Sequence, residues 1–285
     1  MQITARSSAK INLFLKVTGK RPDGYHEICS VMQMVDLFDT LTFDLDPSGK
    51  LSIKVSGTDA PADGTNLVIK AAEALRKWGN IKLGARISLE KNIPVSAGLG
   101  GGSGNAAVAL KTLAILWGIE PTQGEFTRLA LSIGADVPFF LDGPCALVAG
   151  IGEKTKPVTA RKSAAILLVK PDFGVSTAEA YKKSKFDFAP FIANDAMVED
   201  VVSGNPARMR PRMVNDLMPW AMETHPELAR LKERVQAANP KPAFVMMSGS
   251  GPTLFALYDR EEDCGRAAEV LKDSAPFVMA TRTLV

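Results

Sequence analysis

The chain has 285 residues, of which 46% are hydrophobic and 23% are charged, and these proportions exclude a disordered or fibrous protein. The length allows one large domain or two modest ones, each with its own hydrophobic core. The formal net charge is +3, and the chain lacks the clustered excess of cations that is typical of nucleic-acid-binding proteins. We therefore expect no nucleic-acid partner. A small anionic substrate is compatible with this charge balance.

The few cysteines and histidines argue against a disulfide framework and against a catalytic zinc site. Cys29, Cys145 and Cys264 are odd in number and far apart, and the two histidines, His26 and His225, are also far apart. We therefore expect a reducing, cytoplasmic compartment. No apolar run approaches the ~20 residues of a membrane span, and the N-terminus lacks a signal-peptide core, so we expect no membrane association.

In the first half, the spacing of apolar residues predicts several strands near the N-terminus. Further along the chain it predicts a strand, a glycine-rich loop and a helix in direct succession. On the first strand, Lys10 and Asn12 share a face. The first 60 residues are expected to form a β-meander. In chain order the predicted elements are a strand over 11–17, a turn over 21–24, strands over 28–35 and 40–45, a helix over 67–78, a strand over 85–89, helices over 105–117 and 125–133, and a strand over 145–149.

The second half follows a basic, proline-containing stretch at 152–162, where we predict a domain boundary. The predicted domains are 1–160, which would bind nucleotide, and 161–285, which would contribute to substrate binding. Further elements are a buried strand over 164–169, helices over 177–183, 213–223, 226–238 and 262–272, and strands over 243–247, 253–258 and 278–283. Both halves mix helices and strands, which predicts an α+β fold.

The most informative segment is PVSAGLGGGSGNAA at 94–107, a glycine-rich loop between a predicted strand and a predicted helix. Glycines allow close approach of the backbone, and the N-terminus of a helix favours an anion such as phosphate. A flexible glycine turn is the alternative, although Ser103 and Asn105 occupy expected helix-capping positions. The P-loop pattern fails because Gly104 is followed by asparagine, and the dinucleotide pattern is weak because Ser103 replaces its third glycine.

This loop resembles the nucleotide loop of the GHMP kinases, which phosphorylate galactose, homoserine, mevalonate and phosphomevalonate. AKINLFL at 9–15, RPDGYH at 21–26 and GADVPFF at 134–140 are similar to the members that act on 4-diphosphocytidyl-2-C-methyl-D-erythritol. SGSGPT at 248–253 is similar to the third, glycine-rich motif of the superfamily, so the resemblance covers most of the chain.

The resemblance implies a two-domain α+β GHMP kinase fold with the active site in the cleft between the domains. It implies ATP-dependent phosphorylation of the C2 hydroxyl of that cytidylated alcohol, giving its 2-phosphate and ADP, in non-mevalonate (MEP pathway) isoprenoid precursor biosynthesis. ATP and Mg²⁺ are the implied cofactors, and the cytidine diphosphate-linked methylerythritol is the implied partner. We expect a monomer or a weak homodimer.

Two residues are implied to carry the chemistry. Asp136 lies in a loop ahead of Pro138, where an aspartate is most often a turn or capping residue, and a strand lysine such as Lys10 is most often solvated. The resemblance instead makes Asp136 the catalytic base and Lys10 the cation beside it.

Five further residues are implied to bind the substrate. Tyr25 and Tyr181 would be the two walls of a cytosine clamp, and His26 would hydrogen-bond the base. Thr177 would contact the diphosphate, and Asn12 would contact the substrate. From the residues alone, Tyr25 and His26 would be an ordinary surface aromatic and an ordinary histidine.

The nucleotide is expected to contact the glycine-rich loop and Asn66, which from the residues alone can equally be a helix N-cap. Ser103 is the one Mg²⁺ ligand that the pattern suggests, and Gly104 stands where relatives often have a second serine. The loop residues implied to bind ATP are Pro94, Val95, Ser96, Ala97, Gly98, Leu99, Gly100, Gly101, Gly102, Ser103 and Gly104.

Two alternatives stay open at this point. One is a GHMP kinase for another small alcohol such as homoserine or a mevalonate derivative, against which the pair Tyr25 and His26 speaks. The other is a catalytically silent nucleotide-binding module, against which the presence of both Lys10 and Asp136 argues. A basic trio at 208, 210 and 212 fits a solvated helix face better than an anion site.

Overall fold

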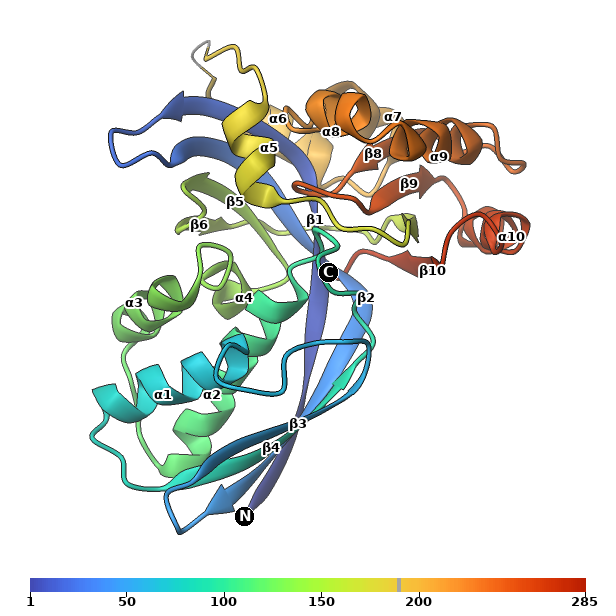
Figure 1. Ribbon diagram of the computed structural model, residues 1–285. Helices are drawn as coiled ribbons and strands as arrows, with labels where there is room; N and C mark the ends of the chain where they lie inside the picture. Colours follow the sequence, from blue (N-terminus) through green and yellow to red (C-terminus); the bar gives the residue numbers. More distant parts are fainter. Residues whose placement is uncertain (189–190) are drawn as a thin grey trace. The chain divides into compact units, whose positions relative to one another are not determined.

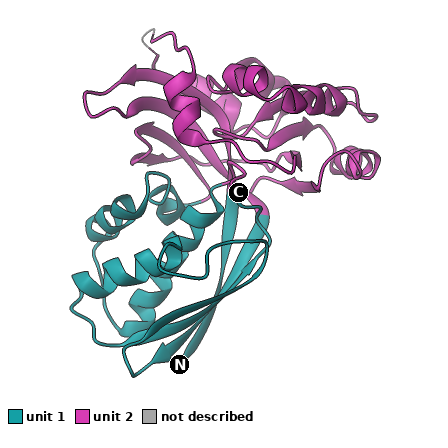
Figure 2. Cartoon of the chain, viewed as in Figure 1, with its two compact units in different colours: residues 1–9, 37–95, 100–143 teal, residues 10–36, 96–99, 144–285 magenta. Residues whose placement is uncertain are grey.

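The computed structural model describes residues 1–188 and 191–285, which form two compact units (Figures 1 and 2). Unit 1 comprises residues 1–9, 37–95 and 100–143, and unit 2 comprises residues 10–36, 96–99 and 144–285. Both units are discontinuous because two long paired strands, β1 (Gln2–Lys20) and β2 (His26–Asp46), each pass from one unit into the other. The compact units therefore do not follow a single cut of the chain, and the boundary at residue 160 stays a prediction.

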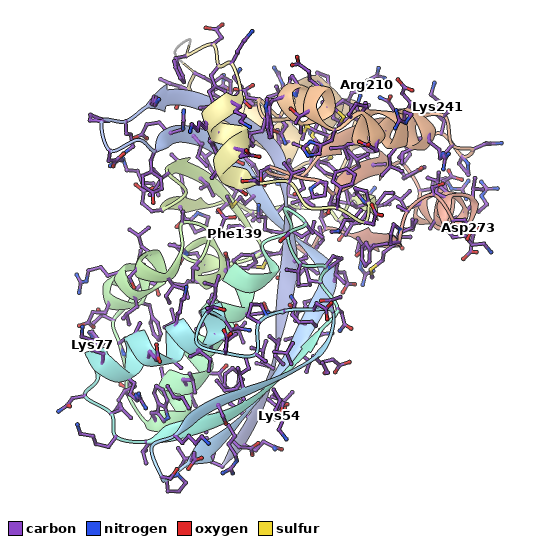
Figure 3. All side chains as sticks on the ribbon, in the orientation of Figure 1. Lys54, Lys77, Phe139, Arg210, Lys241 and Asp273 are labelled. Atoms are coloured by element: carbon purple, nitrogen blue, oxygen red, sulfur yellow. The ribbon has the colours of Figure 1, made fainter. Side chains whose placement is uncertain are left out.

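Unit 1 combines strands with four helices. Strand β4 pairs antiparallel with the last part of β2 and parallel with β3. Helix α1 packs against α2, α3 packs against both, and α4 packs against α2. Phe139 of α4 is buried, whereas Lys54 and Lys77 project from the surface of this unit (Figure 3). Besides the parts of β1 and β2, its elements are β3 (Leu51–Gly57), α1 (Leu67–Trp78), β4 (Gly84–Lys91), α2 (Gly101–Trp117), α3 (Gln123–Ile133) and α4 (Phe139–Asp142).

Unit 2 contains an antiparallel four-stranded sheet with the strand order β10-β7-β9-β8. Helix α10 packs against β7, β9 and β10, and α9 packs against β8. In the same unit the first part of β2 pairs with β5, which pairs with β6. Its elements are β5 (Cys145–Gly150), β6 (Lys154–Pro157), β7 (Ala165–Lys170), α5 (Thr177–Lys183), α6 (Asp195–Val201), α7 (Pro206–Met209), the 3₁₀ helix η1 (Arg210–Arg212), α8 (Met218–Thr224), α9 (Pro226–Gln236), β8 (Phe244–Met247), β9 (Leu254–Tyr258), α10 (Glu261–Leu271) and β10 (Phe277–Arg282).

The core of unit 2 lies between its sheet and its helices. Alternate residues of β7, namely Ala165, Leu167 and Val169, pack with side chains from α8, α9 and α10. The intervening Ile166 and Leu168 are also buried, so both faces of β7 are covered and the prediction of a buried strand is confirmed. Among the described residues no helix is long and apolar enough to cross a membrane.

Most predicted elements are present, and helices α1 and α5 have the predicted bounds. The α+β class is confirmed. The predictions missed several short elements, namely β3, β6, α4, α6, α7 and η1. Of these, β6 falls inside the stretch expected to link two domains, where it pairs with β5.

Three predictions are wrong. The strands expected over 28–35 and 40–45 are one strand, β2, because no glycine or proline interrupts the chain between them. The β-meander is incorrect since β3 pairs with β4 and not with β2. The helix expected over 213–223 begins only at Met218, because backbone groups of Val214 and Asp216 bond to Leu15 of β1.

A buried ion pair anchors the end of β4 in unit 1. The Lys91 ammonium donates to Asp39 Oδ2 at 2.5 Å, and both side chains are almost fully buried. Asp39 Oδ1 accepts from the backbone N–H groups of Asn92 and Ile93, each at 2.8 Å. One carboxylate thus satisfies the ammonium and two backbone donors at the start of the glycine-rich loop.

We predict that Asp39→Asn lowers the free energy of unfolding by about 3 kcal/mol, because it leaves the Lys91 ammonium buried without a counter-charge. Urea denaturation measures this change. Adding Lys91→Met to Asp39→Asn removes the stranded charge and keeps an oxygen for the two backbone donors, so the double variant recovers much of the loss. Equal stability of Asp39→Asn and the parent chain would contradict this account.

Candidate active site

The glycine-rich loop ends as helix α2 begins at Gly101, four residues earlier than predicted. Gly100 is the N-cap residue at φ 67°, and no side chain in the described part of the chain caps the helix. The Gly104 N–H donates to the Gly100 carbonyl at 2.9 Å, so the N–H groups of residues 101–103 have no partner within the helix. These donors and the positive end of the helix dipole form a site suited to phosphate.

Ser103 and Asn105 lie inside α2, so the prediction that they cap this helix is wrong. Glycine favours helix less than other residues do, which is why the periodic pattern placed the start too late. Asn105 is buried, and its Oδ1 has no hydrogen-bond partner among the described residues.

Three consecutive carbonyl groups of the loop are held by two segments of unit 2, namely strand β1 and the turn at 248–253. The Ala97 carbonyl accepts from the Thr253 N–H at 3.3 Å, and the Gly98 carbonyl accepts from Ser248 Oγ at 2.9 Å. The Leu99 carbonyl accepts from the Lys10 N–H at 2.8 Å. The loop, strand β1 and the turn at 248–253 are therefore one hydrogen-bonded assembly.

Gly104 packs closely against β1. A Cβ atom at this position would lie 2.7 Å from Ser7 Oγ and 3.0 Å from the Ser8 carbonyl oxygen, all within unit 1. A side chain here would therefore point at β1. Where relatives often have a second serine, this chain has Gly104 in close contact with β1. Position 104 therefore offers no hydroxyl group and has only its backbone N–H and carbonyl.

Lys10 and Asn12 share a face of β1, as predicted. The Lys10 ammonium donates to Asn12 Oδ1 at 2.7 Å, and the exposed fractions are 4% for Lys10 and 1% for Asn12. Lys10 is thus buried, which overturns the alternative of a solvated lysine. Asn12 also donates through Nδ2 to Ser30 Oγ at 2.8 Å, and sequence reasoning did not identify Ser30.

Asp136 lies in the turn between α3 and α4, where it is half-buried. Helix α3 ends at Ile133, and the N–H of its C-cap residue Gly134 donates to the Ala130 carbonyl. Asp136 belongs to unit 1 and Lys10 to unit 2, so their joint action stays a prediction.

An aromatic cluster in unit 2 consists of His26, Tyr181, Phe186 and Phe188. His26 stacks on Tyr181 with ring centroids 5.5 Å apart, and Phe186 meets His26 edge-on at 5.3 Å. Tyr25 is 59% exposed in the turn ahead of β2. The sequence analysis missed Phe186 and Phe188, although aromatic residues at alternate positions just after α5 were the available signal.

The protonation of His26 is tuned by its surroundings. Burial lowers the pKa of His26 below its ordinary value, and the positive charge of Lys20 lowers it further. The imidazole is therefore neutral at pH 7, with one donor and one acceptor nitrogen.

Thr177 is the first residue of α5, and its Oγ1 lies 2.7 Å from Ser250 Oγ in the glycine-rich turn. Two hydroxyl groups from distant parts of the sequence thus meet within unit 2. Asn215 holds the same turn, since its buried Nδ2 donates to the carbonyls of Met247 and Gly249, both at 2.8 Å. Ser250 lies within the SGSGPT motif at 248–253, whereas no sequence pattern indicated a role for Asn215.

Asn66 is the N-cap of α1, which confirms the helix-capping alternative from the sequence analysis. Its Oδ1 accepts from the Val68 N–H at 2.9 Å, and its Nδ2 donates to the Pro61 carbonyl at 2.6 Å. Its contact with a nucleotide stays a prediction. Of the basic trio, Arg208 and Arg212 are exposed and pair with Asp200, which agrees with a solvated face.

The oxygen groups near the loop suit a hard cation held together with phosphates. Mg²⁺ usually takes one or two protein oxygens and completes its shell with phosphate oxygens and water. The Ser103 hydroxyl lies in the first turn of α2, and its role as a Mg²⁺ ligand stays a prediction. Within residues 1–188 and 191–285, no group of three or more His, Cys, Asp and Glu side chains could form a complete metal cage.

Substitutions at two glycines of the loop test two different properties, namely the stability of the fold and the binding of a ligand. A Cβ at Gly98, at φ +74°, would lie 2.4 Å from the Ser248 carbonyl oxygen, so we predict that Gly98→Ala lowers Tm strongly. A Cβ at Gly102 would meet only Leu67 Cδ1 at 3.4 Å, so Gly102→Ala keeps Tm and weakens the binding of an ATP analogue. Thermal unfolding and calorimetric titration measure the two effects, and a tolerated Gly98→Ala would contradict the close packing.

Comparison with known proteins places this geometry in a family. The model of the GHMP kinases N terminal domain matches residues 66–144, and that of the GHMP kinases C terminal domain matches residues 197–276. The 4-diphosphocytidyl-2-C-methyl-D-erythritol kinase of Pelotomaculum thermopropionicum is 42% identical over 284 residues, covering 99% of this chain and 98% of that protein. The kinase of the same name from Geobacillus sp. is 38% identical, covering 100% of this chain and 98% of that protein.

Solved structures of kinases resemble this chain over its full length. The crystal structure of a 4-(cytidine 5'-diphospho)-2C-methyl-D-erythritol kinase superposes with a TM-score of 0.84 at 33% identity and covers 99% of both chains. A homoserine kinase from Cytophaga hutchinsonii has a TM-score of 0.72 at 19% identity, covers 100% of this chain and 95% of its own, and shares the fold. With its matches to both domain models and to relatives that are 38% and 42% identical over the full chain, this chain belongs to the GHMP kinases.

Proposed function

We propose that this kinase transfers the γ-phosphoryl group of ATP to the C2 hydroxyl of 4-diphosphocytidyl-2-C-methyl-D-erythritol, giving the 2-phosphate and ADP. The observation that carries the choice of substrate is the stacking of His26 on Tyr181, since His26 directly follows the exposed Tyr25 in sequence. Flat rings with a neutral imidazole suit a pyrimidine base. The names of the full-length relatives support the same substrate.

The uncapped start of α2 binds the phosphates in this proposal. The N–H groups of residues 101–103 donate to phosphate oxygens, and the absence of side chains at the glycines lets the backbone approach them. Mg²⁺, when bound, neutralises charge on the transferred group, and Ser103 is the residue that would hold it. Asn66 lies at the start of α1 and contacts the adenosine part.

Asp136 and Lys10 carry the chemical step. The C2 oxygen forms a bond to the γ-phosphorus, the bond between that phosphorus and the bridging oxygen of ADP breaks, and Asp136 takes the hydroxyl proton. Lys10 stabilises the negative charge that develops on the transferred group. Burial strengthens this effect because nearby water screens the ammonium less.

The remaining residues hold the acceptor substrate. Tyr25 and Tyr181 stack on the cytosine, and His26 hydrogen-bonds it. Thr177 donates to the diphosphate from the first turn of α5, with Ser250 beside it.

The described cysteines are free, which suits the cytoplasm that we propose as the compartment.

ADP release from the purified protein with Mg²⁺·ATP tests this assignment against homoserine and mevalonate as acceptors. We expect turnover with the cytidylated alcohol alone. Asp136→Asn lowers kcat by about 10²- to 10⁴-fold because the proton loses its acceptor, whereas the exposed control Asp59→Asn leaves kcat unchanged. Turnover with another alcohol would reassign the substrate, and ATP binding without any turnover would indicate a silent module.

The lowered pKa of His26 gives a pH dependence. Because only the neutral ring offers an acceptor nitrogen, we expect the KM for the cytidylated alcohol to stay constant down to about pH 6.5, the ordinary histidine pKa, and to rise in more acid solution. Lys20→Gln removes a positive charge and raises the pKa of His26, so the rise begins at higher pH. A KM profile that Lys20→Gln does not move would argue against this role of His26.

A further inference from the structure

We propose that Ser30 is a positioning residue that sets the direction of the Lys10 ammonium through the side-chain amide of Asn12. The proposal rests on the function proposed for Lys10 and adds a residue that neither the motifs nor the relatives' names point to. Ser30 lies in β2 and is fully buried, in the part of this strand that belongs to unit 2 together with Lys10 and Asn12.

The three side chains form a relay with short hydrogen bonds. Ser30 Oγ donates to the Phe14 carbonyl at 2.6 Å and accepts from Asn12 Nδ2 at 2.8 Å. Asn12 Oδ1 in turn accepts from the Lys10 ammonium at 2.7 Å. The relay therefore runs from the backbone of β1 through β2 and back to β1.

The count of donors and acceptors permits one arrangement of this relay. A hydroxyl group has one proton, and that of Ser30 is committed to the Phe14 carbonyl, so its oxygen can only accept from Asn12. An ammonium group has no acceptor, so Asn12 must present its oxygen to Lys10. A flipped amide would place N–H groups against the ammonium in a buried site, where a donor without an acceptor is unfavourable.

The surroundings of Lys10 make its direction matter. An atom added as Cβ on Gly249 would lie 3.4 Å from Lys10 Nζ and 3.2 Å from Asn12 Oδ1, so the glycine-rich turn closes one side of the ammonium. Asn215 holds that turn through the Gly249 carbonyl. One N–H of the ammonium points at Asn12, and this bond sets the directions of the other two.

The kinetic test compares Ser30→Ala with the hydroxyl-retaining Ser30→Thr. We expect Ser30→Ala to lower kcat by about 10- to 100-fold, with the KM for ATP and for the cytidylated alcohol changed little, because misplacement of Lys10 acts in the transition state. Ser30→Thr keeps most of kcat. Thr283→Val is the matched control: it removes another buried hydroxyl of unit 2, one that accepts from the Ala164 N–H, and leaves kcat unchanged.

A second readout does not depend on activity. The side-chain NH₂ signals of Asn12, assigned by their loss in Asn12→Asp, are expected to exchange slowly with water in the parent chain and in Ser30→Thr. In Ser30→Ala they shift and exchange faster. Circular dichroism and thermal unfolding check the fold of each variant, and Ser30→Cys, with a weak acceptor of similar size, replaces Ser30→Ala if the alanine variant unfolds.

Each outcome decides something. Unchanged Asn12 signals in Ser30→Ala would overturn the relay, and changed signals with the parent kcat would overturn its positioning role. If the parent chain phosphorylates none of the alcohols, the proposed function fails. The NMR measurement then still decides whether Ser30 orients Asn12 and Lys10.

Discussion

The carbonyl groups of residues 97–99 are the constraint on which the rest of the site depends. Each accepts one hydrogen bond: two come from the turn at 248–253, through the backbone of Thr253 and the hydroxyl of Ser248, and the third comes from the backbone of Lys10 in β1. These bonds hold the first half of the glycine-rich loop in unit 2, immediately before the start of α2. Because Gly98 lies against the Ser248 carbonyl, only a residue without a side chain fits there.

Buried polar groups that each hold several partners extend this constraint. Asp39 satisfies Lys91 and two backbone N–H groups, and Asn215 satisfies two carbonyls of the glycine-rich turn. A buried polar group without partners is costly, so each of these side chains favours one arrangement of the backbone around it. The Lys10 ammonium, also buried, donates in the same way to Asn12 Oδ1.

Local patterns predicted those parts of the molecule that depend on neighbours in sequence. Helix α1 has an N-cap asparagine and an apolar face, and its bounds were predicted correctly. The glycine-rich loop was identified because its glycines and the following helix are consecutive in sequence. In contrast, the pairing of β3 with β4 depends on strands that are distant in sequence, and the predicted meander was wrong.

The sequence by itself determined the α+β class, the glycine-rich loop ahead of a helix, the shared face of Lys10 and Asn12, and the motifs that resemble the GHMP kinases. These features follow from residue type and spacing within short segments. Only the tertiary structure decided that Lys10 is buried, that Asn12 bonds to Ser30, that Asn215 bonds to the turn at 248–253, and that His26 stacks on Tyr181. Burial and side-chain partners arise from contacts between distant segments, which single-chain periodicity does not encode.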